Sequence, residues 1–266
     1  MSWKPSPVEL LRWHLEAGVD ESIGETALDR LAAPPPPEAP RANARVVERP
    51  PQRPGPAPSL ALENPDAAAA DASALADAAL SLAELREALA GFEACPLKWT
   101  ATNLVFGDGA EDAPVMFIGE APGAEEDRQG LPFVGVSGRL LDAMMASIGR
   151  DRSSAYITNI LPWRPPGNRK PTPAETTMCL PFIRRHIALV GPRVLVFLGG
   201  TAAATLLNRR EGITKLRGRW LDYRLDEAEI PAMPTYHPAF LLRQPGLKRD
   251  SWRDFLAVKM RLEEQA

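Results

Sequence analysis

The stretch "GEAPGAEEDRQGLPFVGVSGRLL", from Gly119 to Leu141, directly follows the apolar run "VMFI" and is the most informative part of the sequence. Two glycines, a Pro-Gly turn and four carboxylates come immediately after a segment with the composition of a buried strand. Gly and Pro at the end of a strand form a tight turn, and such a turn can present backbone N–H groups to a ligand. The stretch therefore predicts a strand whose carboxyl end opens onto a polar site.

From this strand onward, apolar runs of strand length alternate with helical stretches. The runs cover 115–119, 155–160, 193–199 and 232–237. The helical stretches cover 137–149, 172–190, 200–208 and 248–264. Thr172 and Glu175 form a Thr-x-x-Glu capping box, with Pro173 at the first helical position. The alternation predicts an α/β fold with three layers (α/β/α) and a central parallel four-stranded sheet.

The N-terminal third of the chain differs from this pattern. We expect a short helical segment over 1–31, a disordered Pro/Ala-rich linker over 32–69, and the α/β domain with its leading helix over 70–266. Residues 34–58 hold 10 of the 28 prolines, which cannot donate to helix or sheet ladders. The N-terminal segment is either a docking peptide for a protein partner or a plain terminal helix. In the leading helix, four leucines are spaced as on one helical face: Leu75, Leu82, Leu85 and Leu89.

Composition limits the class of protein. A hydrophobic share of 45% and a charged share of 24% over 266 residues are those of an ordinary soluble globular protein. No apolar run approaches the roughly 18 residues that a membrane helix needs, so no membrane association is expected. Two cysteines, Cys95 and Cys179, are too few for a disulfide framework, which favours a reducing cytoplasm.

The net charge of −3 conceals a strong asymmetry along the chain. Residues 139–262 carry 21 Lys and Arg against 10 Asp and Glu, whereas residues 1–138 carry 10 against 22. A basic half is typical of a surface that binds a polyanion such as nucleic acid. Surface charges that are segregated without a polyanion partner would give the same count.

Polar or Gly/Pro-rich segments follow each of the four expected strands, and in a parallel sheet these carboxyl ends meet at one edge. They bring together the side chains of Glu120, Phe133, Asn159 and His237. Each residue could instead have a structural role. Glu120 could be a surface carboxylate and Phe133 a core residue. Asn159 could form an Asx turn, and His237 could be a core or capping histidine. Together these residues would form a site with an amide that reads a heterocycle, an aromatic ring that stacks on it and an imidazole that faces an anion. Such a site fits a base that is flipped out of DNA and cut from its sugar.

The blocks "GEAPGAEEDRQGLPFVGVSGRLLD", "YITNILPWRPPGNRKPTPAE", "VLVFLGGTAA", "ITKLRGRW" and "HPAFLLR" carry a family resemblance. In this order, residues 92–262 resemble the uracil-DNA glycosylase superfamily, specifically its family 4, the iron–sulfur bacterial and archaeal branch. The resemblance implies a monomeric base-excision repair enzyme, associated with a bacterial nucleoid in the cytoplasm. Such an enzyme hydrolyses the N-glycosidic bond of uracil in DNA and leaves an abasic site. No lysine in the motifs is placed for a Schiff base, so no lyase step is expected.

The resemblance also implies roles for individual residues in the uracil pocket. Asn159 would read uracil through N3–H and O4, and Phe133 would stack on the flipped base. His237 would bond O2 and stabilise the departing uracil anion, and Glu120 would position water or stabilise the oxocarbenium-like sugar. The backbone of Ala121 would contribute to the pocket.

Two positions depart from the best-studied branch of the superfamily. That branch has an Asp at the equivalent of Ala121, so less general-base assistance is expected here. It also has a Tyr at the equivalent of Gly123 that rejects the methyl group of thymine, and Glu126 is expected to take that task.

The resemblance places the DNA contacts in two loops. Leu241 or Leu242 would wedge into the space that the base leaves, and Arg243 would contact a phosphate. Three cations of the loop after the second strand would lie along the DNA backbone: Arg164, Arg169 and Lys170. Two further readings remain open: a DNA-binding module that kept the fold and lost the chemistry, and a different nucleotide-processing α/β enzyme.

The cysteines depart from the family pattern. The family places four cysteines around a [4Fe–4S] cluster, which needs four thiolates or substitutes. At those positions this sequence has Phe92, Cys95, Trp163 and Cys179. Because Phe and Trp cannot ligate iron, we expect no cluster and no other metal. Cys95 and Cys179 would then be small buried apolar residues.

Overall fold

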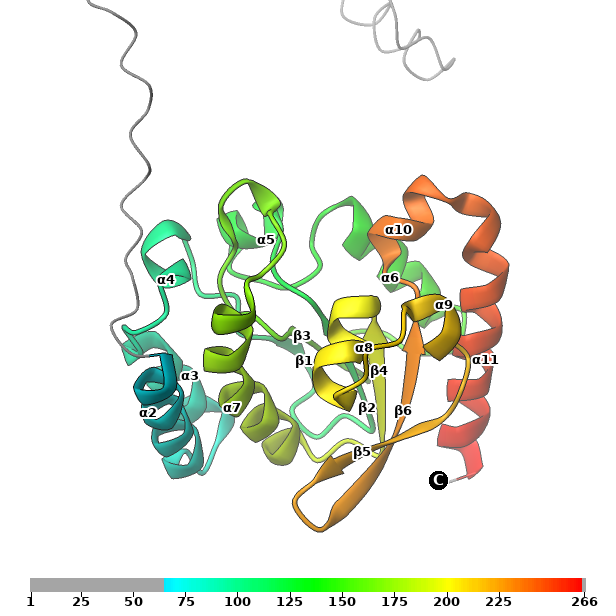
Figure 1. The fold of residues 1–266 in the computed structure, drawn as a ribbon. Coiled ribbons are helices and arrows are strands. Elements are labelled where there is room, and N and C mark those ends of the chain that lie inside the picture. Colours follow the sequence, from blue (N-terminus) through cyan, green and yellow to red (C-terminus); the bar gives the residue numbers. More distant parts are fainter. Residues whose placement is uncertain (1–64, 265–266) are drawn as a thin grey trace, which may run out of the picture. The chain divides into compact units, whose positions relative to one another are not determined.

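The computed structural model describes residues 65–264, at whose centre lies a six-stranded sheet of order β1-β3-β2-β4-β6-β5 (Figure 1). Its four central strands run parallel. They are β3 (Tyr156–Asn159), β2 (Val115–Gly119), β4 (Val194–Leu198) and β6 (Ala228–Thr235). The edges are formed by two antiparallel strands, β1 (Asp108–Gly109) and β5 (Leu221–Leu225).

The sequence predicted only the four parallel strands, so the expected strand count was too low. The physical reason is that edge strands give a weak signal in the sequence. β1 has two residues, and β5, "LDYRL", buries only Tyr223. The central strands β2, β3 and β4 are buried at every position, which gives the near-continuous apolar runs of a parallel sheet.

Helices cover both faces of the sheet, which confirms the three-layer α/β/α arrangement (Figure 1). Met116 and Ile118 of β2 belong to a core shared with four helices: α2 (Pro65–Ala78), α3 (Leu82–Gly91), α7 (Pro173–Val190) and α8 (Gly200–Leu207). Val115 and Phe117 point to the opposite face and belong to a core shared with α6 (Val136–Ala146) and α11 (Lys248–Glu264). The alternation follows from the two-residue period of a strand.

The principal helices lie close to the ranges that the sequence predicts. They are α2 (Pro65–Ala78), α3 (Leu82–Gly91), α6 (Val136–Ala146), α7 (Pro173–Val190), α8 (Gly200–Leu207) and α11 (Lys248–Glu264). Short helices are α4 (Leu97–Thr100), α5 (Ala124–Gln129), α9 (Ile213–Leu216) and α10 (Pro238–Arg243), with 3-10 turns at Pro166–Asn168 and Pro245–Leu247. At the start of α7 the predicted capping box is present, with Glu175 N–H donating to Thr172 Oγ1 and Thr172 N–H donating to Glu175 Oε2. Within residues 65–264 no helix is long and apolar enough to cross a membrane.

The leading helix differs from the prediction of one continuous leucine face. It is divided into α2 and α3, because Ser81 accepts a hydrogen bond from Glu84 N–H and starts a new helix. Leu75 is 39% exposed. The buried face of α2 consists of small residues that pack against α7: Ala68, Ala72 and Ala76. Leucine spacing alone could not show that alanine lets two helices approach closely.

The domain boundaries stay predictions. The N-terminal segment and almost all of the Pro/Ala-rich linker lie outside the described residues. The first described helix begins at Pro65, before the predicted domain start at residue 70.

Candidate active site

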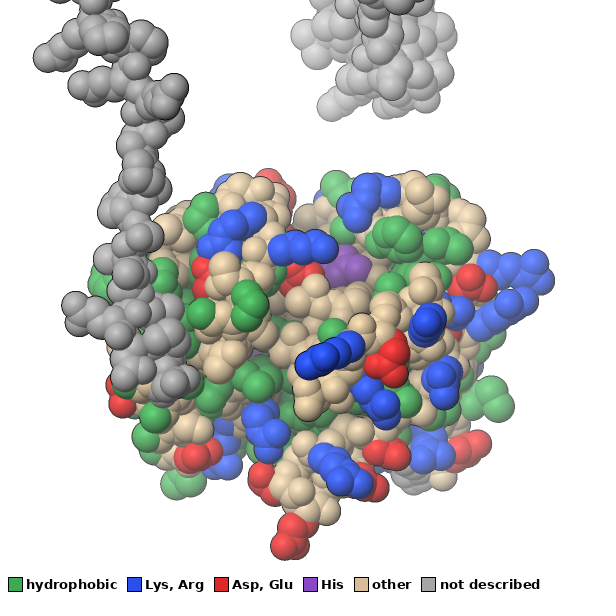
Figure 2. All heavy atoms as spheres, viewed as in Figure 1, with side chains coloured by type: hydrophobic (Ala, Val, Ile, Leu, Met, Phe, Trp, Pro, Cys, Tyr) green, Lys and Arg blue, Asp and Glu red, His purple; other side chains and the backbone are tan. Residues whose placement is uncertain are grey.

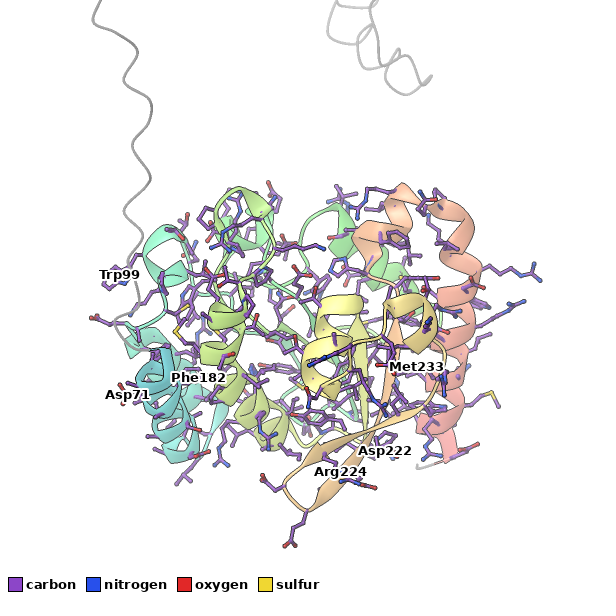
Figure 3. The ribbon with its side chains drawn as sticks, in the orientation of Figure 1. Asp71, Trp99, Phe182, Asp222, Arg224 and Met233 are labelled. Carbon is purple, nitrogen blue, oxygen red and sulfur yellow. The ribbon has the colours of Figure 1, made fainter. Side chains whose placement is uncertain are left out.

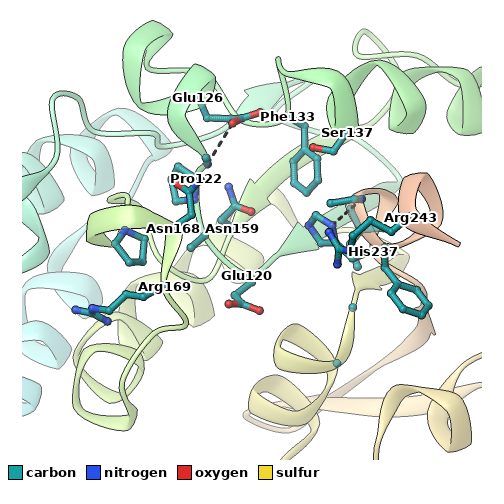
Figure 4. A pocket seen from close by; sticks show the side chains of 18 residues that line it. Glu120, Pro122, Glu126, Phe133, Ser137, Asn159, Asn168, Arg169, His237 and Arg243 are labelled. Atoms are coloured by element: carbon teal, nitrogen blue, oxygen red, sulfur yellow. Dashed lines mark hydrogen bonds between the residues drawn. The ribbon is translucent and has the colours of Figure 1, made fainter. Parts of the chain in front are cut away.

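A cavity of about 440 Å³ opens at the carboxyl ends of the parallel strands (Figure 4). Each of the four loops predicted to meet there contributes to its lining: Glu120 after β2, Asn159 at the end of β3, Gly199 and Gly200 after β4, and His237 after β6. Figure 2 shows a hollow on this side of the molecule, with a histidine and carboxylates inside it and Lys and Arg side chains on its rims. The parallel sheet thus brings distant segments to one site.

Asn159 carries an unsatisfied buried group at this site. The residue is 5% exposed, and its side-chain Oδ1 has no hydrogen-bond partner among the described residues. A buried acceptor without a donor is costly, so an orphan of this kind indicates a ligand group. Gly119 makes room for it, because a Cβ at Gly119 would overlap Asn159 Oδ1 and lie 2.7 Å from Phe133 Cζ.

Phe133 lies next to Asn159 and closes the cavity on one side (Figure 4). Its backbone has φ of 53°, in the left-handed region that is rare for a bulky residue. The centroid of its ring lies 5.5 Å from that of the His237 imidazole, at an interplanar angle of 32°. The aromatic ring, the amide and the imidazole therefore border the same space.

His237 has a defined tautomer. It is the N-cap of α10, and its Nδ1 accepts a hydrogen bond of 3.1 Å from Ala239 N–H. A neutral imidazole that accepts at Nδ1 carries its proton on Nε2. Burial, together with the positive charge of Arg243, lowers the pKa of His237 to about 4. At neutral pH the residue is an uncharged N–H donor.

The two acidic residues of the cavity have different surroundings. Glu120 points toward the cavity on the side away from Glu126 (Figure 4), and no hydrogen bond to its carboxylate is found among the described residues. Glu126 is 8% exposed and accepts three backbone N–H groups, from Gly123 at 3.1 Å, Val134 at 3.0 Å and Gly135 at 2.9 Å. Glu126 thereby ties the turn after β2 to the loop that carries Phe133. Its expected contact with a base stays a prediction.

Two of the three candidate DNA-binding cations in the loop after β3 already form hydrogen bonds within the protein. Arg169 donates to both carboxylate oxygens of Glu175, at 2.9 and 2.5 Å, and Arg164 Nε donates to Asn168 Oδ1 at 2.7 Å. Lys170 is exposed on the same loop.

On α10 the two leucines differ sharply. Leu241 is 1% exposed and belongs to the interior, whereas Leu242 is 39% exposed. Arg243, the last residue of α10, lines the cavity. Between the two leucines, only Leu242 presents an apolar side chain to a partner on this face.

The four residues at which the family resemblance expects cluster ligands lie in one buried core. Phe92 is 3% exposed and Trp163 is 2% exposed. The Phe92 ring lies 5.1 Å from that of Phe182, which sits on the side of α7 facing α2 and α3 (Figure 3). Cys95 and Cys179 are buried free thiols, and the hydrogen bond with Cys95, together with burial, raises the pKa of Cys179. In the part of the chain described, no group of three or more His, Cys, Asp or Glu could hold a metal ion.

Two neutral histidines, the buried His186 and the partly buried His237, predict a loss of stability in mild acid. Burial lowers the pKa of His186 to about 3, and that of His237 is about 4, whereas the unfolded chain binds these protons near pH 6.5. As pH falls from 6.5 toward 4, the unfolded state therefore gains protons that the folded state does not. The free energy of unfolding should fall by up to about 1.4 kcal/mol per pH unit for each histidine.

Urea unfolding between pH 7 and pH 5 would measure this slope, because ordinary exposed carboxylates titrate below this range. His186→Phe, which keeps a ring stacked on Phe106, is the control and should remove about half of it. A slope unchanged by that substitution would contradict the assignment.

Several cavity residues were not singled out by the sequence. Ser137, Asn168 and Phe240 line the cavity. They lie within the quoted motifs, but single polar or aromatic residues beside a turn carry no signal of their own. Arg152 was also missed, although its guanidinium bonds the Phe133 carbonyl oxygen at 2.6 Å. The hydrogen bond of Arg152 depends on how α6 packs against the preceding loop, which carries Phe133.

Comparison with known proteins agrees with this geometry. The family model described as "Uracil DNA glycosylase superfamily" matches residues 106–257. A type-4 uracil-DNA glycosylase of Sulfurisphaera tokodaii is 38% identical over 184 residues, which are 67% of this chain and 84% of that protein. Those of Archaeoglobus fulgidus and Thermotoga maritima are 40% and 42% identical, covering 62% and 56% of this chain and 84% and 77% of their own.

Proposed function

Because this chain belongs to the uracil-DNA glycosylase superfamily, we propose that it is a DNA-repair enzyme that hydrolyses the N-glycosidic bond of uracil in DNA. It flips the base out of the helix and leaves an abasic site. The observation that carries the proposal is the orphan acceptor Asn159 Oδ1, buried in a cavity that also holds the His237 Nε2–H donor.

The amide of Asn159 accounts for selection of uracil. Uracil offers a donor at N3–H beside an acceptor at O4, which pairs with an amide that accepts through Oδ1 and donates through Nδ2. Cytosine offers an acceptor at N3 and a donor at its amino group, so both contacts would be mismatched. Leaving buried polar groups unpaired is how such a site rejects the wrong base. Phe133 stacks on the face of the accepted base.

His237 acts on the leaving group. As the glycosidic bond breaks, negative charge develops on uracil O2, and a neutral Nε2–H donor placed there stabilises it. The hydrogen bond from Ala239 N–H to Nδ1 keeps the proton on Nε2 before the reaction begins. The donor is therefore preorganised, and no proton has to move to reach the anionic product.

Glu120 acts on the sugar side. Its carboxylate faces the cavity and can orient water or stabilise the cationic character of the deoxyribose in the transition state. Ala121 lines the same wall and has no titratable side chain, so its contribution is its backbone. For Glu126 we propose contact with the C5 edge of the base. Its carboxylate is already fixed by three N–H groups, so it can act there as a rigid wall.

The solvent exposure of the candidate side chains indicates which of them contact DNA. Leu242 is the wedge that fills the space of the flipped base, since Leu241 is buried. Arg243 and Lys170 bind phosphates directly. Arg164 contributes charge to the same loop, and Arg169 holds the loop through Glu175. The enzyme acts as a monomer at the bacterial nucleoid in the cytoplasm. The N-terminal segment, which lies outside the described residues, is either a docking peptide for a protein partner or a plain terminal helix.

The residues at the four cluster positions do not fit a [4Fe–4S] cluster, and we propose that the enzyme works without one. Only two thiols are present, they hydrogen-bond to each other, and Phe92 and Trp163 occupy buried positions in the same core. The prediction is that purified protein contains no stoichiometric iron and keeps its activity and Tm after treatment with an iron chelator.

Metal analysis and absorbance near 400 nm measure the outcome. Cys95→Ala combined with Cys179→Ala is the matched variant and should keep the glycosylase rate within a few-fold. Four iron atoms per chain, lost in this double variant, would overturn the proposal.

The experiment that tests the function is uracil release from an oligonucleotide with one labelled uracil, in single and double strands, with alkali to cleave the abasic site. Release from folded protein is expected, without strand cleavage before alkali. Equal binding to uracil-containing and undamaged DNA with no release would favour a DNA-binding module that has lost the chemistry.

A further inference from the structure

The side chain of Arg152 connects the loop that carries Phe133 to β1 and to α6. Its Nη2 donates to Phe133 O at 2.6 Å, and its Nη1 donates to Pro132 O at 3.1 Å. The same guanidinium is held by two carboxylates, with Nη1 to Asp108 Oδ2 at 2.6 Å and Nε to Asp142 Oδ1 at 3.0 Å. All three nitrogens of the group are therefore used, and two consecutive carbonyl oxygens depend on them.

The backbone that these bonds hold is strained. Phe133 has φ of 53°, which costs free energy for a residue with a bulky side chain and persists only where the surroundings fix it. The first turn of α6 presses on the same peptide, because a Cβ at Gly138 would overlap Phe133 O. One carbonyl oxygen is thus packed against a glycine and bonded by a guanidinium.

The ring of Phe133 is fixed from the other end as well. It is 4% exposed, packs over Gly119, and lies beside His237. Its direction into the cavity follows from the left-handed backbone, since a residue in the ordinary extended or helical regions would direct its Cβ elsewhere. Arg152 itself is not among the residues that line the cavity. Its effect on a bound base can pass only through the loop that it holds.

We infer that Arg152 is a positioning residue for base binding: it locks the Phe133 backbone in the left-handed conformation that places the ring against the flipped base. This inference rests on the proposed function, in which Phe133 stacks on uracil. Arginine is required because its planar fork donates to two carbonyls and two carboxylates at once. Lysine keeps the charge but has a single nitrogen, which cannot span these four acceptors.

The test is a double-mutant cycle on uracil release in single-turnover conditions. Arg152→Lys is expected to lower the rate about 10- to 100-fold, since a displacement of about 1 Å at a reacting site can cost 10²-fold. In a Phe133→Ala background the same substitution should change the rate less than about threefold, because no ring is left to misplace. The inhibition constant of free uracil should rise in Arg152→Lys and stay unchanged in the double variant relative to Phe133→Ala.

A matched control separates positioning from general destabilisation. Asp142→Asn removes one ion pair of Arg152 while leaving both carbonyl bonds in place, and the rate should stay within about twofold. Should Arg152→Lys fail to fold, Asp108→Asn keeps the guanidinium but weakens the anchor of Nη1, the nitrogen that also donates to Pro132 O, whereas Asp142 binds only Nε. A smaller loss of rate is therefore expected in Asp108→Asn, in the same direction.

The outcomes distinguish this inference from the proposed function. If the effects of Arg152→Lys and Phe133→Ala multiply as independent changes, Arg152 is a structural residue and the inference is overturned. If Phe133→Ala alone leaves uracil release unchanged, the stacking function proposed for Phe133 fails, and the inference fails with it. If Phe133→Ala slows release and suppresses the effect of Arg152→Lys, both stand.

Discussion

Replacement of His237 by alanine is expected to lower the single-turnover rate of uracil release by about 10²- to 10³-fold, as does loss of one preorganised oxyanion donor in other enzymes. The reason is that the imidazole lines the cavity with Nδ1 already used as an acceptor, and that burial keeps it neutral, with a pKa of about 4. Affinity for uracil-containing DNA should change much less, because the charge on O2 develops only as the bond breaks.

His237 has a second function that the experiment must separate. Its Nδ1 caps α10, and loss of a cap costs about 0.5–2 kcal/mol of stability. His237→Asn is the matched variant, because Asn is a good N-cap but is too short to replace the Nε2–H donor. We expect His237→Asn to recover the Tm lost in His237→Ala and to remain inactive. Recovery of the rate together with the Tm would show that capping, rather than donation to O2, is the function of this residue.

The pH dependence of the wild-type rate tests the same assignment. Because the pKa of His237 is about 4, the rate should show no inflection near pH 6.5 on account of this group. Protonation below pH 4 would place a proton on Nδ1, which could no longer accept from Ala239 N–H. An inflection near pH 6.5 that disappears in His237→Asn would contradict the neutral-donor mechanism.

Asn159→Ala is expected to lower uracil release at least about 10²-fold and to reduce discrimination between uracil and cytosine. The substitution removes the acceptor for N3–H and the donor for O4 together, and leaves a cavity on the reading edge of the base. Asn159→Asp keeps the shape of the side chain but places a second oxygen opposite O4, so it should also be slow. Both rates are measured on matched oligonucleotides that carry uracil or cytosine at one position.

The neighbouring strand position provides a control for Asn159. Thr158 is also buried, and its hydroxyl donates to Phe106 O at 2.6 Å on the other face of β3. Thr158→Val should lower stability by about 1–3 kcal/mol, because it leaves that carbonyl unpaired, and should keep the rate of uracil release. If Thr158→Val slows release as much as Asn159→Ala does, the effect of Asn159 is structural.

Much of the site could be predicted because its determinants are local in the sequence. The buried strand at 115–119 and the capping box of Thr172 and Glu175 depend on residue types at short spacing. The edge of a parallel sheet then follows from topology, which is why the sequence predicts Glu120, Asn159 and His237 at one site. The structure brings all three to the lining of one cavity.

Other features were decided only by tertiary packing. The sequence could not choose between Leu241 and Leu242, since both follow the same motif; the choice depends on which side of α10 meets the interior. The sequence also predicts that Arg169 lies along DNA, which stays a prediction, but it does not show that the guanidinium is paired with Glu175. The sequence of a loop does not show whether the partner of its arginine is a phosphate or a buried carboxylate.

The alternation of strands and helices and the residue types at the carboxyl edge follow from the sequence alone, because they depend on periodicity and residue identity. The sequence likewise shows that the chain has two cysteines. The two edge strands, the Nε2–H tautomer of His237 and the left-handed backbone of Phe133 become visible only in the folded structure. Each of these depends on a hydrogen bond or a steric contact in three dimensions. The contact between Arg152 and Phe133 joins residues 19 positions apart, and no local pattern encodes such a pair.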